Sequence, residues 1–427
     1  MAEKLAIHGG NPVRARSWPH WPEFGDAERE ALQRVLESHN WGGHPSPNVE
    51  ARALSQEFAA YAGSSYAVPT LNGTISLTLA LQAARLSPGA EVITTAYTFV
   101  ATASAIVAAG CVPVFVDVLS ETYCLDPDQV AAAVGPRTEA IIPVHLACSM
   151  ADMDRLEELA QRRGLLLVED CAHAHGARWR GRGAGSIGDF GSFSMQSSKL
   201  MTAGEGGIVT TSDDTYEQRL QSLVNCGRKE PGYDGFPERM LGMNARITEW
   251  QAAVLREQLR RLPGQHQRRA ARIECFEKQI ASVPGLRPLA RDDRVTERTA
   301  YQFILRYDSA SFAGVPRDEV LLALGAEGVP CYGRFYVPIP EDPLFAMDPQ
   351  TNPVARIGAD YSGGTFPVTS RAAYQESIWL PHFLFLGGDE EVDDLVAAFA
   401  KVQAGASALR RSADGEESQD RRSRSEP

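Results

Sequence analysis

The 427-residue sequence predicts an α/β protein, with a large domain built on a mostly parallel mixed sheet between helices and a smaller α+β domain after it. Before Pro263, short apolar runs alternate with segments of helical periodicity, which is typical of a parallel sheet covered on both faces. The runs are rich in Val, Ile and Leu and nearly uninterrupted, which indicates strands buried on both sides. The expected strands are 91–95, 112–118, 140–146, 164–169, 190–195 and 208–211.

The clearest helix of this part is expected at 49–62. Leu54, Phe58 and Tyr61 recur there at i, i+4 and i+7, so they share one helix face, and Gly63 supplies the stop. A second helical run, over 75–85, starts directly after a Gly-Thr step.

The pattern breaks at Pro263-Gly264, which precedes a long charged helix expected to begin at 265. The sequence therefore divides into a large domain with an N-terminal arm at 1–264, a small α+β domain at 265–404 and a disordered tail at 405–427. The tail is predicted from its Ser, Arg, Asp and Glu content without apolar periodicity. In the small domain, helices are expected at 265–280, 317–324 and 389–402, and strands at 301–307 and near Val329.

Charge and cysteine content exclude several classes of protein. Asp and Glu number 54 against 42 Lys and Arg, and a net charge of −12 argues against a nucleic-acid or membrane partner. The seven cysteines are scattered and never form a Cys-x-x-Cys pair, so neither a disulfide framework nor a thiolate zinc site is indicated. The N-terminus has no apolar signal core, and the uncharged stretch 99–116 is better explained as a helix followed by a buried strand than as a membrane span. We expect a cytoplasmic protein.

Two familiar motifs occur in contexts that do not suit them. The GAGSIG stretch at 183–188 matches the dinucleotide-binding pattern, but it follows a charged segment and precedes a strand, so a tight turn is predicted. The Asp-Phe-Gly triplet at 189–191 has none of the other protein-kinase signatures.

A metal site is one interpretation of the dense polar cluster that follows the strand at 164–169. The spacings match no zinc pattern and further ligands would be needed, so no metal is predicted. The cluster contains Glu169, Asp170, Cys171, His173 and His175, with His145 as the obvious additional ligand.

Four separated features together point to pyridoxal phosphate. Asp170 ends a buried strand and could hold a pyridinium nitrogen, and Lys199 lies among small hydroxyl and glycine residues in a setting that suits a Schiff base. Gly73-Thr74 opens a helix whose N-terminus offers N–H groups to a phosphate, and Phe99 follows a strand and could stack on a ring. Alone, these residues would be a helix cap, a surface lysine, a helix start and a core aromatic. Their joint occurrence favours the cofactor.

Two sequence segments make a specific resemblance visible. EDCAHAHG at 169–176 and SMQSSKLMTAGEGG at 194–207 resemble the PLP-dependent sugar and cyclitol aminotransferases of the DegT/StrS group. Within that group, the chain looks most like glutamine:scyllo-inosose aminotransferases and 3-amino-5-hydroxybenzoate synthases. The resemblance extends from about Leu5 to Phe399.

The resemblance implies a fold-type-I aminotransferase and a role for each matching residue. Lys199 would form the Schiff base and move the proton, Asp170 would hold the pyridinium, and His173 would lie against the ring or its phenolic oxygen. Phe99 would stack on the ring.

The resemblance also assigns a phosphate site and a partner. Gly73, Thr74 and Ser194 would bind the phosphate. Asn244 would reach the phosphate of the neighbouring subunit, which implies a homodimer with shared active sites.

The function implied is transfer of an amine from L-glutamine or L-glutamate to a keto-cyclitol or keto-sugar, in aminocyclitol or aminosugar antibiotic biosynthesis. Three alternatives stay open: a PLP-dependent dehydratase or lyase of the same fold, a non-catalytic PLP-binding regulator, and a metal hydrolase. Relatives often carry a His-Tyr-x-Pro stretch where this chain has GRFYVP at 333–338. Arg334 therefore either contacts a substrate or is a solvated arginine.

Overall fold

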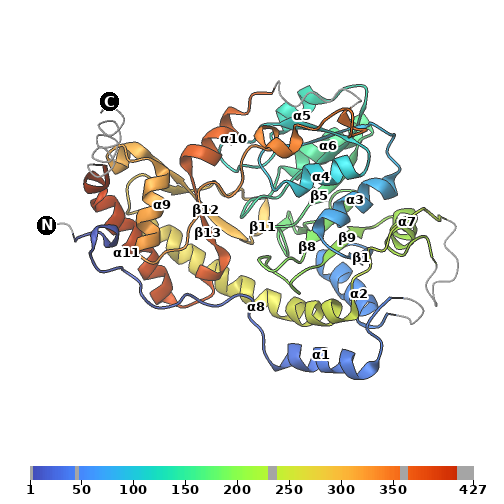
Figure 1. The fold of residues 1–427 in the computed structure, drawn as a ribbon, viewed down its shortest axis with the longest axis horizontal. Coiled ribbons are helices and arrows are strands. Elements are labelled where there is room, and N and C mark those ends of the chain that lie inside the picture. The colour runs from blue at the N-terminus through green and yellow to red at the C-terminus, as the bar shows by residue number, and fades with distance from the viewer. Residues whose placement is uncertain (1–2, 44–47, 229–237, 356–363, 411–427) are drawn as a thin grey trace, which may run out of the picture.

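The computed structural model describes residues 3–43, 48–228, 238–355 and 364–410, and in this part of the chain seven strands form the central sheet (Figure 1). The strand order is β1-β9-β8-β5-β4-β2-β3. All neighbours from β3 to β8 are parallel, whereas β9 is antiparallel to both β8 and β1. The expected mostly parallel mixed sheet is confirmed. Its strands are β1 (Tyr66–Thr70), β2 (Glu91–Thr95), β3 (Val112–Val116), β4 (Thr138–Ile142), β5 (Leu166–Asp170), β8 (Phe190–Ser194) and β9 (Gly207–Thr211).

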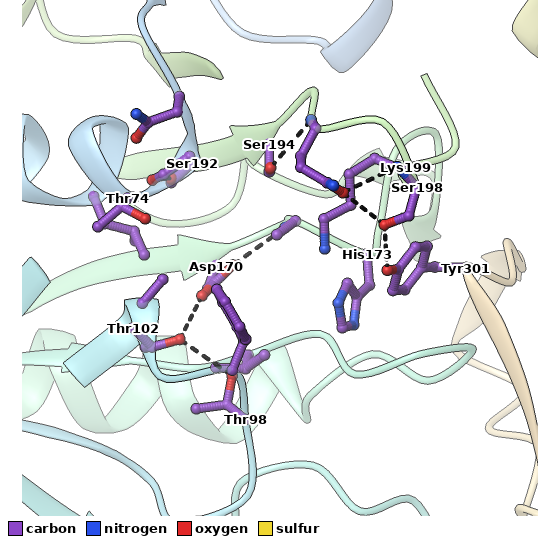
Figure 2. A pocket seen from close by; sticks show the side chains of 18 of the residues that line it. Thr74, Thr98, Thr102, Asp170, His173, Ser192, Ser194, Ser198, Lys199 and Tyr301 are labelled. Atoms are coloured by element: carbon purple, nitrogen blue, oxygen red, sulfur yellow. Dashed lines mark hydrogen bonds between the residues drawn. The ribbon is translucent and has the colours of Figure 1, made fainter. Parts of the chain in front are cut away.

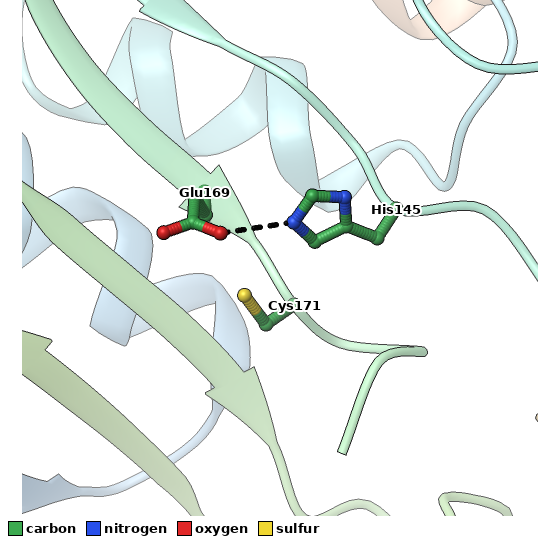
Figure 3. A group of neighbouring side chains, drawn as sticks. All are labelled: His145, Glu169 and Cys171. Carbon is green, nitrogen blue, oxygen red and sulfur yellow. Dashed lines mark hydrogen bonds and ion pairs between the residues drawn. The ribbon is translucent and has the colours of Figure 1, made fainter. Parts of the chain in front are cut away.

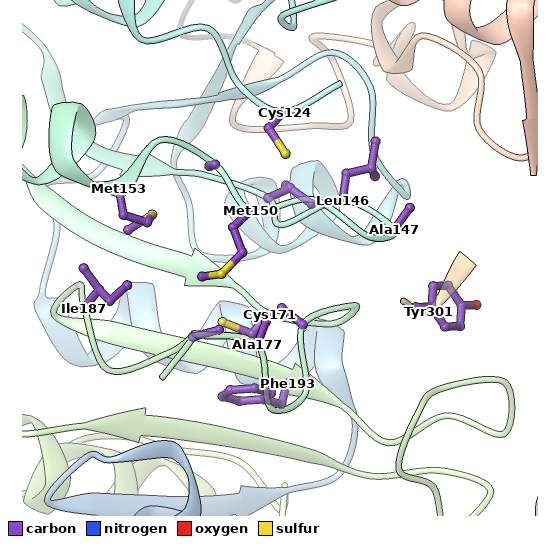
Figure 4. Packing of buried hydrophobic residues seen from close by; sticks show 14 of the residues in the cluster. Cys124, Leu146, Ala147, Met150, Met153, Cys171, Ala177, Ile187, Phe193 and Tyr301 are labelled. Atoms are coloured by element: carbon purple, nitrogen blue, oxygen red, sulfur yellow. The ribbon is translucent and has the colours of Figure 1, made fainter. Parts of the chain in front are cut away.

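Apolar side chains leave this sheet on both faces. Ile93 and Leu167 belong to one buried cluster, whereas their neighbours Val92 and Val168 belong to another, as the two-residue period of a strand requires. Figure 4 shows part of the first cluster, with Met150 and Phe193 among its members. Helices cover both clusters: α2 (Glu50–Ala62), α3 (Gly73–Ala84), α4 (Ala101–Ala108), α5 (Pro127–Ala133), α6 (Met153–Arg163) and α7 (Asp214–Val224).

A separate core lies toward the C-terminus. In the described residues, β10 (Leu286–Pro288), β12 (Gln302–Tyr307) and β13 (Ser377–Pro381) form an antiparallel sheet, covered by α9 (Arg317–Ala326) and α11 (Asp389–Ala404). A second short sheet, β11-β6-β7, has strands of two or three residues, which are too short for a periodic signal. They are β6 (Arg178–Trp179), β7 (Arg182–Gly183) and β11 (Val295–Glu297). Two further helices are α1 (Asp26–Ser38) and α10 (Pro367–Arg371).

The prediction that a helix begins only after Pro263-Gly264, at 265, is wrong. Helix α8 (Glu249–Ile280) runs through Pro263 without a break, and Figure 1 shows it passing from the large sheet to the C-terminal core. An interior proline costs a helix about 3 kcal/mol. Burial offsets that cost, because Leu262 packs into the first core and Phe276 into the C-terminal core, and each such side chain contributes about 2 kcal/mol. The expected domain boundary at 264 thus falls inside a helix, and the division into domains stays a prediction.

Two other expectations for the C-terminal part need correction. No strand forms near Val329, where the structure has only a single bridge between Tyr332 and Trp379. Residues 406–410 of the expected disordered tail are helical, because Ala406 and Leu409 are buried in the C-terminal core. The rest of that tail lies outside the described residues.

The uncharged stretch 99–116 forms α4 and β3, as expected. Among the described residues, no helix is both long enough and apolar enough to cross a membrane.

The turn at 183–188 has a structural role of its own, because its backbone binds the carboxylate of Glu169. That side chain is fully buried near the end of β5. The amides of Gly185, Ile187 and Gly188 donate to it at 3.0, 2.7 and 2.8 Å, and the Nε2 of His145 lies 3.0 Å away (Figure 3). The Gly-rich sequence therefore presents N–H groups to a carboxylate of the protein itself.

The group His145, Glu169 and Cys171 does not fit a metal ion. The Nδ1 of His145 accepts the amide of Ala151 at 3.2 Å, so its Nε2 carries the proton and donates it to Glu169. Both ring nitrogens of His145 and both carboxylate oxygens of Glu169 are thus already used within the protein. Burial raises the pKa of the Cys171 thiol well above its usual value and keeps it protonated.

Replacing Glu169 with Gln should lower the free energy of unfolding by about 3 kcal/mol, because it removes a buried charge that holds three backbone amides and an imidazole. Chemical denaturation measures this loss. The exposed Glu297→Gln is the matched control and should change stability little. Dialysis against a chelator should leave the unfolding temperature of the wild-type protein unchanged, and a fall would return a metal to this site.

Candidate active site

The principal cavity lies at the carboxyl ends of the central strands, where open parallel sheets bind ligands. It has a volume of about 510 Å³ and is closed from the other side by Tyr301, Phe335 and Tyr336. In Figure 2, Thr74 lies at one end of the view, Tyr301 at the other and Asp170 between them. Seven of the eight residues expected at the site, all of them described, line this cavity: Gly73, Thr74, Phe99, Asp170, His173, Ser194 and Lys199.

Asn244, the eighth, is exposed and does not line the cavity of its own chain. Its backbone pairs with that of Asn225. The expectation that it reaches a neighbouring subunit stays a prediction.

The phosphate end of the cavity is the N-terminus of α3. The Asn72 side chain caps this helix by accepting the amide of Ile75 at 2.9 Å. No acceptor among the described residues takes the amides of Gly73 and Thr74, so both are available, with the positive end of the helix dipole, to a phosphate. A Cβ on Gly73 would lie 2.7 Å from the Cβ of Ser194, so only glycine allows this close approach.

Asp170 stands at the end of β5, with its carboxylate held from two sides. Thr102 donates its hydroxyl to one oxygen at 2.8 Å and the amide of Ala172 binds the other at 3.1 Å. Burial raises the pKa of Asp170, although both hydrogen bonds and Lys199 act in the opposite direction. A cation bound to the carboxylate would relieve that penalty, as a protonated pyridine nitrogen would.

Lys199 enters the same cavity from the loop after β8. It is buried, and no hydrogen bond or ion pair joins its ammonium to another described residue. Its Nζ lies 4.3 Å from the centroid of the Tyr301 ring. Burial lowers the pKa of Lys199 to about 8, with Asp170 opposing the shift. At pH 7 roughly a tenth of this amine is therefore unprotonated and nucleophilic, far more than for a lysine in water.

His173 lies between two tyrosines that the sequence analysis did not select. Its ring stacks on Tyr301 with centroids 4.2 Å apart, and its Nε2 lies 3.0 Å from the hydroxyl of Tyr336. The Nδ1 of His173 accepts the amide of Ala147 at 3.2 Å, so the proton is on Nε2. Burial lowers the pKa of His173 well below its usual value, which keeps the ring neutral.

Several residues that line the cavity were not selected from the sequence. Thr98 follows a predicted strand by three residues and could have been found from that position, whereas Thr102 lies in the first turn of α4. Tyr301 and Tyr336 belong to the C-terminal half and are indistinguishable there from core aromatics. Arg334, by contrast, does not line the cavity and donates to Asp318 at 3.1 Å. In the single chain it is therefore a solvated arginine and not a cavity residue.

The comparisons with known proteins cover nearly the whole chain. The DegT/DnrJ/EryC1/StrS aminotransferase family matches residues 22–400. The protein named "Putative L-glutamine:3-amino-2,3-dideoxy-scyllo-inosose aminotransferase" from Streptoalloteichus tenebrarius is 46% identical over 96% of this chain and 100% of its own length. An L-glutamine:2-deoxy-scyllo-inosose aminotransferase of the same organism is 40% identical over 94% of this chain and 98% of its own.

A solved structure agrees with these relatives. The crystal structure of 3-amino-5-hydroxybenzoic acid synthase matches with a TM-score of 0.79 and 35% identity, covering 92% of this chain and 100% of its own. The family consists of PLP-dependent aminotransferases, and the expected family and fold are confirmed. With its cavity at the strand ends and relatives over almost its full length, this chain belongs to the DegT/DnrJ/EryC1/StrS aminotransferase family.

Proposed function

We propose that this aminotransferase binds pyridoxal phosphate in the cavity and moves an amine from L-glutamine, or from L-glutamate, to the ketone of a cyclitol. The observation that carries the proposal is the buried Lys199 amine, which has no ion-pair partner among the described residues and shares its cavity with Asp170. The named relatives support glutamine as the donor and a scyllo-inosose as the acceptor.

The cofactor would lie between the start of α3 and Tyr301. When bound, pyridoxal phosphate supplies an aldehyde for the amine and a ring that takes up electrons from the reacting carbon. The Gly73 and Thr74 amides and the Ser194 hydroxyl would bind the phosphate, and Asp170 would keep the proton on the pyridine nitrogen. Lys199 would bind the aldehyde and then, once freed as a neutral amine, accept the proton as an ammonium group and give it up again.

The remaining lining suits a neutral, hydroxylated acceptor. Among the described lining residues, Lys199 is the single Lys or Arg side chain. An acceptor substrate with a phosphate group of its own would therefore find no further cation in this lining. Hydroxyl and amide side chains such as Thr98, Gln196 and Ser198 offer hydrogen bonds to a polyol. A keto-cyclitol fits this lining, and we place the reaction in aminocyclitol antibiotic biosynthesis. A keto-sugar is the second acceptor class.

A dehydratase or lyase of the same fold is the second candidate, because 3-amino-5-hydroxybenzoic acid synthase shares the fold at 35% identity. The two reactions differ in whether the product retains the amine. The named relatives are aminotransferases, so we do not retain the regulator and metal-hydrolase hypotheses.

We propose a cytoplasmic homodimer. Leu241, three residues before Asn244 in sequence, is 99% exposed, and Phe99 is 53% exposed although it lines the cavity. Exposed apolar side chains beside a binding site are typical of an interface. All seven cysteines are free, as is usual in a reducing compartment.

Adding L-glutamine to the purified protein loaded with pyridoxal phosphate should bleach its visible absorption band, because the amine passes to the cofactor. L-Glutamate in a parallel cuvette decides between the donors, and Lys199→Ala should lack both the band and the response. A protein that cannot be reconstituted with pyridoxal phosphate would contradict the proposal.

Asp170→Asn should lower kcat by roughly a thousandfold while leaving the fold intact. Two unit charges 4 Å apart at an effective dielectric constant of about 20 interact by about 4 kcal/mol, which is about three decades in rate. Steady-state kinetics with circular dichroism as the folding control tests this. Activity near the wild-type level would remove Asp170 from the role.

Mixing Lys199→Ala with Asn244→Asp subunits should restore about one quarter of wild-type activity, because half of the dimers are mixed and each has one intact site. The control mixture, Lys199→Ala with Asp170→Asn, should restore none, because both changes act in a site of their own chain. No recovery in the first mixture would contradict a shared site.

A further inference from the structure

The loop that carries Lys199 is held in an unusually complete way. Residues 194–198, which lead to Lys199, are here called the lysine loop. Every backbone carbonyl oxygen of the lysine loop accepts a hydrogen bond. The donors are His175 Nε2 to Ser194 (2.9 Å), Thr202 Oγ1 to Met195 (2.9 Å), the Lys199 amide to Gln196 (2.8 Å), Trp21 Nε1 to Ser197 (3.0 Å) and His382 Nε2 to Ser198 (3.2 Å).

Three of these donors are ring N–H groups from distant parts of the chain. Trp21 belongs to the N-terminal arm, His175 follows β5, and His382 follows β13. The rings of Trp21 and His382 are in edge contact, with centroids 4.5 Å apart at 88°. The position of Lys199 therefore depends on how these three rings are oriented.

Both histidines leave a buried lone pair without a partner. A carbonyl oxygen can only accept, so the Nε2 of His175 and of His382 carries the proton and the Nδ1 of each is an acceptor. Both Nδ1 atoms are buried and bond to no other described residue. Burial lowers the pKa of His175 to about 3, with smaller contributions from Lys199 and Arg269, and burial with Arg269 lowers that of His382.

Arg269 carries buried donors that are likewise unpaired among the described residues. This residue of α8 is 1% exposed, and its Nε, Nη1 and Nη2 bond to no other described residue. Its guanidinium lies 5.3 Å from the centroid of the Trp21 ring. The nearby Glu23 carboxylate accepts from Gln265 at 3.0 Å and from Arg268 instead. Because Arg269 is buried within the single chain, a second subunit cannot reach it.

Buried donors and acceptors are rarely left unpaired in proteins, and ordered water commonly joins them. We propose that Arg269 is a positioning residue for Lys199. Through buried water it binds the Nδ1 atoms of His175 and His382, and with Trp21 against its guanidinium it orients the ring N–H groups that hold the lysine loop. This inference rests on the proposed role of Lys199 for its effect on catalysis, whereas its effect on the loop is independent of that role.

Hydrogen–deuterium exchange of the peptide that contains the lysine loop tests the proposal directly, in the protein with and without pyridoxal phosphate. Arg269→Gln should exchange about tenfold faster there, because the loop opens more often when its ring donors lose their support. Arg268→Gln, the neighbouring arginine that binds Glu23, is the matched control and should exchange at the wild-type rate. Arg269→Lys, which keeps the charge, should restore part of the protection.

The kinetic signature separates positioning from general destabilisation. Arg269→Gln should lower kcat about tenfold with little change in KM, because a misplaced amine affects the reaction more than binding. If Arg269→Gln does not fold, Trp21→Phe takes its place, because it removes one ring N–H and keeps the ring. Faster exchange confined to the lysine loop supports the proposal. Wild-type exchange there in the folded variant, or an equal increase throughout the protein, overturns it.

These outcomes are distinct from a failure of the proposed function. If the wild-type protein binds no pyridoxal phosphate while Arg269→Gln still loosens the lysine loop, the function fails and the positioning role stands.

Discussion

The site depends on the burial of an amine without a counter-ion. Lys199 and Asp170 share one low-dielectric cavity, yet hydrogen bonds from Thr102 and Ala172, and not an ion pair with Lys199, hold the Asp170 carboxylate. Burial moves both groups toward their neutral forms. A lysine in this state can act as a nucleophile and a base, and a carboxylate in this state gains from a cationic ligand.

Such burial requires rigid support, because charged side chains escape to water wherever the backbone allows it. The structure provides that support at two levels. Glu169, next to Asp170 on β5, binds the turn at 183–188 and anchors the strand end. Ring donors from three distant segments bind the lysine loop, and the guanidinium of Arg269 on α8 lies beside one of these rings, that of Trp21. Helix α8 also connects the two cores, so site geometry and overall packing are coupled through one element.

Sequence reasoning succeeded where the chemistry is local. Six of the seven strands described in the central sheet are visible as apolar runs, whereas β1 was not expected, and Asp170, Lys199 and Gly73 occupy recognisable positions at strand ends and at a helix start. It failed at Pro263, because the break inferred from Pro-Gly ignores the side chains that α8 buries in both cores. It also missed the helical residues 406–410, whose two buried side chains are too few to give a periodic signal.

The sequence by itself determined the family and most of the central sheet, and it pointed to the residues that we propose react, because these follow from periodicity and from short motifs. Only the tertiary structure decided which aromatic and charged residues complete the site. Tyr301, Tyr336 and Trp21 look in sequence like core aromatics, and only their contacts with His173, Lys199 and the lysine loop distinguish them. Arg269 looks like one more arginine of a charged helix, and only its burial beside Trp21 distinguishes it. These contacts join residues more than a hundred positions apart, and no local pattern encodes such a distance.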